Sequence, residues 1–196
     1  WAKELAPYYD QCNRMFGVQV SPYMETDSDR IMRAVAADMK RPYLRAPLGI
    51  HFGTPGAEAE DPYFGGAGPR RTGCIGCNDC SNGCRFNAKN KTTVNYLYLA
   101  EAAGAVVHEL NEVHTLRPLD DGGYEVIARH PGPLGLAGAR HHYKARQVIL
   151  SAHAFGTAQI LLSMKHDGTL HRLSDEAGKR ARTNSEALVS VMRSEE

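Results

Sequence analysis

Residues 146–164 read RQVILSAHAFGTAQILLSM, and this stretch decides the predicted fold. Its first part, 146–152, is mostly apolar, which predicts a strand. A glycine-containing turn follows, and apolar residues then recur at helical spacing over 155–164, which predicts a helix. A strand–turn–helix unit of this kind indicates the second half of a nucleotide-binding, Rossmann-like α/β domain.

The residues upstream of this unit predict a small antiparallel sheet. Segments 105–110 and 112–116 are rich in β-branched and apolar residues. Asp121-Gly122-Gly123 is a hairpin signal, and 124–128 alternates as a return strand. The fold class that we predict for the whole chain is therefore α/β, with a mixed α+β character.

The first half of the chain predicts helices separated by ordered loops. Apolar spacing indicates one helix over 1–15 and a second from Asp27 or Ser28 to Met39, before Pro42. Residues 43–83 carry many Pro and Gly residues, which favours irregular loops. A third helix is expected from Thr92 or Thr93 to a glycine stop at Gly104.

The composition excludes some classes of partner. The chain has 196 residues, and 23 basic against 22 acidic side chains give a net charge of +1. This balance offers no attraction to nucleic acid, and no nucleic-acid partner is expected. Apolar runs such as 148–150 are far shorter than the roughly 20 residues that a membrane-spanning helix needs, so no transmembrane segment is expected. Nothing in the sequence predicts an oligomeric state.

Four of the five cysteines lie close together, at Cys74, Cys77, Cys80 and Cys84. Their C-x2-C-x2-C-x3-C spacing is typical of ligands to a [4Fe-4S] cluster, which makes an iron–sulfur electron-transfer module one hypothesis. Against it, Arg85 stands where ferredoxins have proline. A structural zinc site is a further alternative. The third alternative is a loop of reduced thiols without metal, which the family resemblance described below favours. Reduced thiols would suit a reducing compartment such as the cytoplasm, but the sequence does not fix the compartment.

Several segments together resemble one enzyme family. The residues are WAKELAPYY at 1–9, GCRFNAKN at 83–90 followed by NYL at 95–97, NEVHTL at 111–116, SAHAFGT at 151–157 and RTNSE at 182–186. They are similar to segments of the glucose-methanol-choline (GMC) oxidoreductases, nearest to the cholesterol-oxidase-like branch. The resemblance spans nearly the whole chain. At the position of His153 the family commonly has a small residue, often glycine.

The resemblance implies an FAD-dependent oxidation of an alcohol, with hydride transfer to the flavin and a small apolar alcohol, possibly a sterol, as substrate. It assigns 1–88 to a portion of the substrate-binding domain and 89–196 to a portion of the FAD-binding domain. Val113 inherits a contact with the adenine end of FAD. The other cofactor-binding candidates are Asn90, Ser151, Ala152 and His153.

The resemblance also implies that the chain is an internal fragment of such an enzyme. The family's G-x-G-x-x-G phosphate loop and its catalytic histidine match no segment of this sequence, so no catalytic residue is expected in it. A third hypothesis is a non-catalytic domain that binds an apolar ligand and no flavin.

Overall fold

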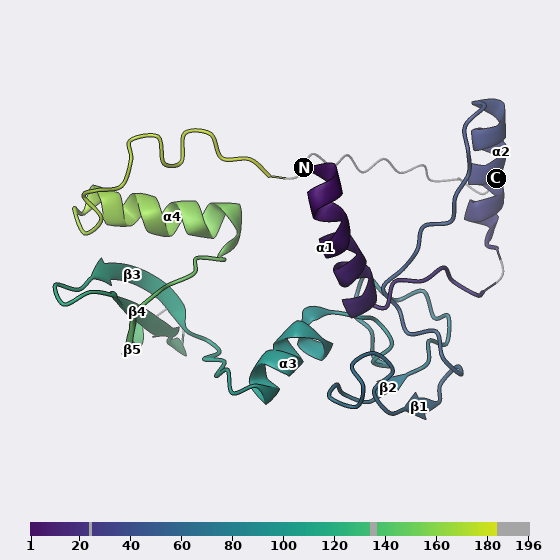
Figure 1. Ribbon diagram of the computed structural model, residues 1–196, viewed down its shortest axis with the longest axis horizontal. Helices are drawn as coiled ribbons and strands as arrows, with labels where there is room; N and C mark the ends of the chain where they lie inside the picture. The colour runs from purple at the N-terminus through teal and green to yellow at the C-terminus, as the bar shows by residue number, and fades with distance from the viewer. Residues whose placement is uncertain (24, 134–136, 184–196) are drawn as a thin grey trace. The chain divides into compact units, whose positions relative to one another are not determined.

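The computed structural model describes residues 1–23, 25–133 and 137–183. Contacts divide the chain into two compact units, Trp1–Val107 (unit 1) and His108–Glu196 (unit 2). Figure 1 labels the helices and strands of each unit. The division concerns packing within this chain. The predicted assignment of 1–88 and 89–196 to two domains of a longer enzyme is a separate matter and stays a prediction.

Unit 1 begins with the two predicted helices. Helix α1 spans Ala2–Met15, and Gly17 follows it in the left-handed region with φ 52°, as expected for a glycine that ends a helix. Helix α2 spans Asp27–Asp38 and starts at Thr26, whose side chain accepts a hydrogen bond from the backbone N–H of Asp29. The Asp29 carboxylate accepts one from the backbone of Thr26 in return, which completes a capping box. Neither helix buries a residue within the described chain.

The rest of unit 1 is mostly irregular, as the Pro- and Gly-rich sequence predicts. Strands β1 (Glu58–Ala59) and β2 (Arg71–Thr72) form a two-residue antiparallel pair. The 3-10 helix Thr92–Val94 and helix α3 (Tyr96–Ala102) follow the loops, and Gly104 ends this helical segment with φ 97°. The predicted single helix over 92–104 is therefore correct in place but broken at Asn95. A small apolar cluster, Ile50, Phe52 and Ala88, is buried beneath the loops.

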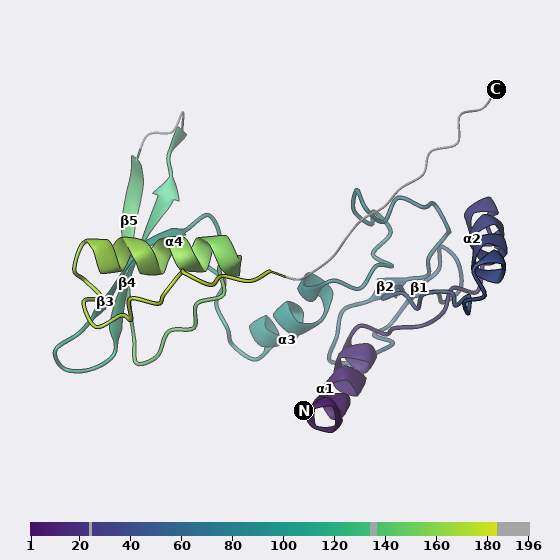
Figure 2. The same ribbon diagram turned by 90° about the horizontal axis from the view of Figure 1, so that it is seen from above.

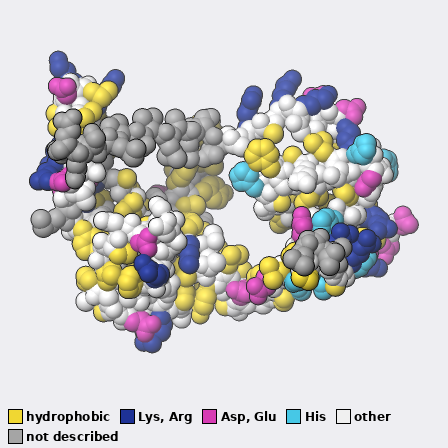
Figure 3. All heavy atoms as spheres, turned by 180° about the vertical axis from the view of Figure 1, so that it is seen from behind, with side chains coloured by type: hydrophobic (Ala, Val, Ile, Leu, Met, Phe, Trp, Pro, Cys, Tyr) yellow, Lys and Arg dark blue, Asp and Glu magenta, His cyan; other side chains and the backbone are white. Residues whose placement is uncertain are grey.

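Unit 2 is an antiparallel three-stranded sheet with a helix over it. Strands β3 (Glu112–Pro118), β4 (Tyr124–Pro131) and β5 (Ala137–Ala145) pair in that order. Helix α4 (His153–His166) packs against β3, and Figure 2 shows it lying across the strands. The buried side chains Leu116, Ala128 and Met164 form the interior. Charged and histidine side chains cover much of this unit on the face seen in Figure 3.

The mixed helix and sheet agrees with the predicted α/β class, and α4 and the hairpin are confirmed. Two predicted strands are wrong. Residues 105–110 are irregular, and Leu110 takes a left-handed φ of 55° that interrupts an extended chain. Residues 146–152 are also irregular, with Ile149 89% exposed. A strand needs a hydrogen-bonded neighbour, and none of the described strands pairs with either segment. Strand β5 was not predicted.

Among the residues that the structure describes, no helix combines the length and the apolar character needed to cross a membrane.

Candidate functional site

Unit 2 contains a cavity of about 570 Å³ between its sheet and α4. Strand β3 supplies Val113 and Leu116, and the irregular 148–152 segment supplies another wall. Gly156 and Ile160 line it from α4. The pairing of β3 with β4 shifts by one residue between Val113 and Thr115, a bulge that redirects the side chains at this end of the strand. The result is a mostly apolar cavity at the edge of a small sheet.

A polar side chain, Asn111, also lines this cavity. Its Nδ2 donates to the carbonyl oxygen of Glu109 at 2.8 Å. Its Oδ1 is buried and has no hydrogen-bond partner among the described residues. An acceptor left in this state costs about 1–3 kcal/mol. Asn111 is therefore a polar residue in a mostly apolar lining, and its buried acceptor atom lacks a donor among the described residues.

The structure brings three of the five predicted cofactor-binding residues together. Val113, Ser151 and Ala152 all line the cavity of unit 2, although they come from a strand and from a loop more than thirty positions further along the chain. His153 lies on a neighbouring open groove, beside Thr157 and Arg182. The cofactor contacts of all these residues stay predictions.

His153 is the first residue of α4 and has a left-handed backbone, with φ 60°. A side chain with a Cβ atom adopts this conformation at a cost of about 1–2 kcal/mol, whereas glycine adopts it freely. The left-handed φ is compatible with the expectation that the resembling family has a small residue, often glycine, at this position. The histidine ring stacks on Phe155, with ring centroids 6.3 Å apart.

Asn90 lies in unit 1, where both ends of its side-chain amide are hydrogen-bonded. Its Oδ1 accepts a hydrogen bond from Arg71, and its Nδ2 donates to the carbonyl oxygen of Phe16 at 2.6 Å. The side chain is buried with only 7% of its surface exposed. The structure thus gives Asn90 a role in holding the loops of unit 1 together, and its predicted cofactor contact is a separate proposal.

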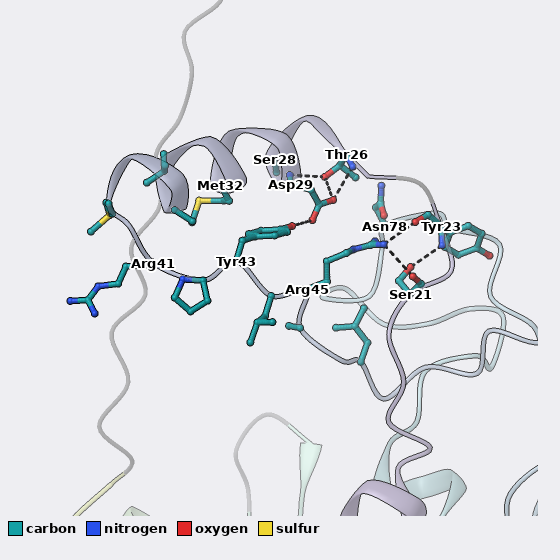
Figure 4. Close-up of a pocket in the computed structure, with 18 of the residues that line it drawn as sticks. Ser21, Tyr23, Thr26, Ser28, Asp29, Met32, Arg41, Tyr43, Arg45 and Asn78 are labelled. Carbon is teal, nitrogen blue, oxygen red and sulfur yellow. Dashed lines mark hydrogen bonds between the residues drawn. The ribbon is translucent and has the colours of Figure 1, made fainter.

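Unit 1 carries a wider groove of about 970 Å³ beside α2. Figure 4 shows Met32 of α2 turned toward the 41–45 segment, with Tyr43 opposite it. Val35 and Met39 extend the apolar side along the helix. The sequence predicted the helix but no groove beside it. The signal that could have revealed a groove was a methionine-rich helix face without an obvious partner segment.

The polar end of this groove is a hydrogen-bonded cluster. The hydroxyl of Tyr43 donates to Oδ1 of Asp29 at 2.8 Å, and Thr26 bonds to the same carboxylate. The backbone N–H of Thr26, the Tyr43 hydroxyl and the Thr26 hydroxyl lower the pKa of Asp29 to about 2. In turn, the Asp29 carboxylate raises the pKa of Tyr43. Arg45 donates to the carbonyl oxygens of Ser21 and Tyr23 nearby (Figure 4).

The four clustered cysteines line one small cavity of about 110 Å³ in unit 1. All are free thiols: Cys77 is exposed, whereas Cys74, Cys80 and Cys84 are half-buried. Within the described parts of the chain, no three histidine, cysteine or acidic side chains are arranged to hold a metal ion.

Comparison with known proteins adds to this geometry. No protein-family model matches the chain. The chain is 43% identical to cholesterol oxidase from Mycobacterium tuberculosis (strain ATCC 25618 / H37Rv) over 198 residues, which cover 97% of the chain and 34% of that protein. It is 34% identical to cholesterol oxidase from Acinetobacter baumannii over 207 residues, covering 97% of the chain and 36% of that protein.

The chain therefore spans about a third of the length of the curated relatives that it matches. Of the RTNSE segment, 182 and 183 are described, and 184–186 lie outside the described residues. Along nearly its whole length, the chain is similar to cholesterol oxidases.

Proposed function

We propose that this chain is part of an FAD-dependent enzyme of the GMC type that oxidises an apolar alcohol such as a sterol. The observation that carries the proposal is the common cavity of Val113, Ser151 and Ala152 in a sequence that is cholesterol-oxidase-like. In this proposal, unit 2 holds the adenine end of FAD. When bound, FAD supplies the redox chemistry by accepting a hydride from the alcohol carbon.

The residues of unit 2 fit an adenine ring. The side chain of Val113 offers an apolar surface to one ring face, and Ile160 lies across the cavity on α4. The unsatisfied Oδ1 of Asn111 is the acceptor that an exocyclic amino group would satisfy after a small side-chain shift. These residues bind and orient the cofactor, and they take no part in moving the hydroxyl proton.

The groove beside α2 supports the substrate side of the proposal. Its apolar side is made of Met32, Val35 and Met39, and flexible methionine side chains adapt to irregular apolar ligands. An apolar alcohol in this groove would bury its hydrocarbon skeleton against α2, which is the main source of affinity for such a ligand.

The test is the flavin content of the intact protein and of two matched variants. Val113→Glu places a charge in the cavity, whereas Thr115→Glu changes a residue of the same strand that does not line it. We expect the intact protein and Thr115→Glu to purify yellow with FAD bound. Burying a carboxylate against the ring should weaken FAD binding in Val113→Glu about tenfold or more.

Measuring bound FAD by absorbance and by equilibrium titration distinguishes the outcomes. An intact protein without flavin would sink the proposal as a whole. Equal FAD affinity in Val113→Glu and the unmodified protein would overturn the placement of adenine in this cavity.

A further inference from the structure

The thiol-lined cavity of unit 1 has no role in the proposed flavin chemistry. Cys74, Cys80 and Cys84 all pack against the buried cluster of Ile50, Phe52 and Ala88. The three cysteines line the same small cavity, and the surrounding segments are mostly irregular loops. The question is which thiols can react, and with what.

Cys84 lies in surroundings that stabilise a thiolate. Its Sγ accepts a hydrogen bond from the backbone N–H of Ala88 at 3.3 Å. Burial alone raises the pKa of Cys84, but nearby backbone N–H groups, that of Lys89 foremost, and the charge of Lys91 outweigh it and lower the pKa. The buried guanidinium of Arg71 is close enough to interact with this thiol as well.

Cys80 has the opposite character. Burial and then the other three thiols raise the pKa of Cys80, whereas the pKa of Cys84 is lowered. Its carbonyl oxygen accepts a hydrogen bond from Nζ of Lys89 at 2.8 Å. This bond holds Cys80 against the same 88–89 segment that binds the sulfur of Cys84.

Cys74 is the other half-buried candidate, and its backbone is fixed at both ends. Its N–H donates to the carbonyl oxygen of His51 at 2.9 Å, and its own carbonyl oxygen accepts the hydroxyl of Tyr23. By contrast, the residues between Cys80 and Cys84 are exposed, and Gly83 has φ 114° with open space around it. The 80–84 loop can adjust its backbone more readily than Cys74 can.

We propose that Cys84 is a peroxide-reactive thiol and that it closes a reversible disulfide with Cys80. The geometry that points to this pair is their shared cavity, their common support on 88–89 and the adjustable loop between them. The site is a modification site for small peroxides, and it is independent of flavin binding.

The chemistry has two balanced steps. In the first, the Cys84 thiolate attacks one oxygen of hydrogen peroxide: the S–O bond forms, the O–O bond breaks, and the leaving hydroxide takes a proton to become water. The sulfur is oxidised to a sulfenic acid and the peroxide is reduced. In the second, the Cys80 sulfur attacks the Cys84 sulfur, the S–S bond forms, and the hydroxyl leaves with the thiol proton as water.

The experiment treats the intact protein with hydrogen peroxide and maps thiols by alkylation and mass spectrometry. Cys12, exposed on α1, is the internal control. We expect Cys84 to be consumed roughly tenfold faster than Cys12, and a Cys80–Cys84 disulfide that dithiothreitol reverses. Cys12→Ser should leave this unchanged.

Two variants separate the steps. Cys84→Ser should abolish the disulfide, and Cys80→Ser should leave Cys84 as a sulfenic acid that a dimedone probe traps. Because Cys80→Ser reports on Cys84 directly, the test survives if Cys84→Ser folds poorly. Equal reactivity of Cys84 and Cys12, a disulfide through Cys74, or iron or zinc bound by these thiols in the purified protein would each overturn the proposal.

Discussion

The two units bury different kinds of side chain. Among the described residues, the buried polar side chains, Arg71, Asn90 and Asn95, all lie in unit 1. In the described part of unit 2 the buried residues are the apolar Leu116, Ala128 and Met164, and Asn111 is half-buried with its Oδ1 atom covered. In unit 2 the sheet pairs the backbone N–H and C=O groups, so side chains need only fill space. In unit 1 the irregular backbone leaves carbonyl groups that side chains must satisfy.

Arg71 shows how this works. Only 1% of its surface is exposed, and it donates to the carbonyl oxygens of Asn87 and Ala88 at 2.9 and 3.0 Å. It also bonds to the side chain of Asn90. One guanidinium thus connects β2 to the 87–90 segment. In unit 2, the corresponding connections between segments are backbone hydrogen bonds between strands. The two units should therefore respond to different substitutions.

The largest effect is expected from Arg71→Met. Methionine keeps much of the volume but leaves the carbonyl oxygen of Asn87 and Oδ1 of Asn90 without donors, whereas the carbonyl oxygen of Ala88 keeps the N–H of His51. We expect unit 1 to lose about 3 kcal/mol of unfolding free energy or more. The control is Arg70→Met, which removes exposed ion pairs with Glu58 and Glu60 and should cost less than about 1 kcal/mol. Urea unfolding measures both. Equal losses of unfolding free energy in the two variants would mean that the buried guanidinium contributes no more to stability than an exposed one. The claim that unit 1 depends on buried polar side chains would then be wrong.

A smaller loss should follow Leu116→Ala in unit 2. This side chain is 5% exposed, and its removal leaves a space in an interior closed by α4. We expect a loss of about 2–3 kcal/mol by urea unfolding. Ile149→Ala serves as the control, because Ile149 is 89% exposed and should change stability by less than about 0.5 kcal/mol. Comparable losses in the two variants would show that the 146–152 segment packs more closely than its exposure indicates.

A gain, not a loss, is expected from His153→Gly. Glycine removes the cost of a left-handed φ of 60° at the start of α4, although it adds freedom to the unfolded chain. The net gain should be about 0.5–1 kcal/mol. His153→Ala keeps a Cβ atom and should show no gain in the same unfolding measurement. A gain from alanine equal to that from glycine would indicate that the imidazole, and not the backbone, causes the strain.

The sequence predicts an element of this fold when the signal for that element is local. It fails when the element forms only by pairing with another segment. Helices α1, α2 and α4 carry their own signal, the apolar spacing, and all three were predicted. The predicted start of α2 at Asp27 or Ser28 was wrong as a cap, because the capping side chain is that of Thr26. The β3–β4 hairpin was predicted from its turn. Strand β5 was missed because its His141, His142 and Tyr143 lack the apolar pattern, and pairing with β4 alone makes it a strand.

The candidate site also has some features that the sequence predicted and others that only the structure shows. The family resemblance named Val113 and the 151–152 pair as cofactor-binding candidates, and that prediction stays untested. Their common cavity is a finding of the structure, since nothing in spacing joins residues so far apart in sequence. The unpartnered Oδ1 of Asn111 and the buried Arg71 could not be predicted from the sequence. The first depends on which N–H donors come near it in the fold, and the second on which carbonyl groups the loops leave nearby. In a polar interior each buried polar group needs a hydrogen-bond partner, and the identity of that partner depends on the folded arrangement. A hydrophobic pattern in the sequence does not contain this information.

The smallest effect concerns α2, a helix of unit 1 that buries no side chain in the described chain and is stabilised by its polar cap. The pKa of Asp29 is lowered from 3.8 to about 2, chiefly by the backbone and side chain of Thr26 and by Tyr43. Because the folded pKa lies below the ordinary value, this contribution is fully present above pH 3.8 and is lost as the pH falls toward 2. The start of α2 should then fray over that range.

Thr26→Ala tests this link by removing the hydroxyl that bonds to Asp29 while leaving the backbone bond in place. We expect the pKa of Asp29, followed by NMR titration of its side chain, to move part of the way back toward 3.8. Tyr43→Phe should produce a similar shift, because it removes the other side-chain donor. If both variants leave the pKa of Asp29 near 2, the backbone N–H alone stabilises the carboxylate. The start of α2 would then depend on a main-chain contact, as the strands of unit 2 do, and the contrast between the two units would not extend to their helices.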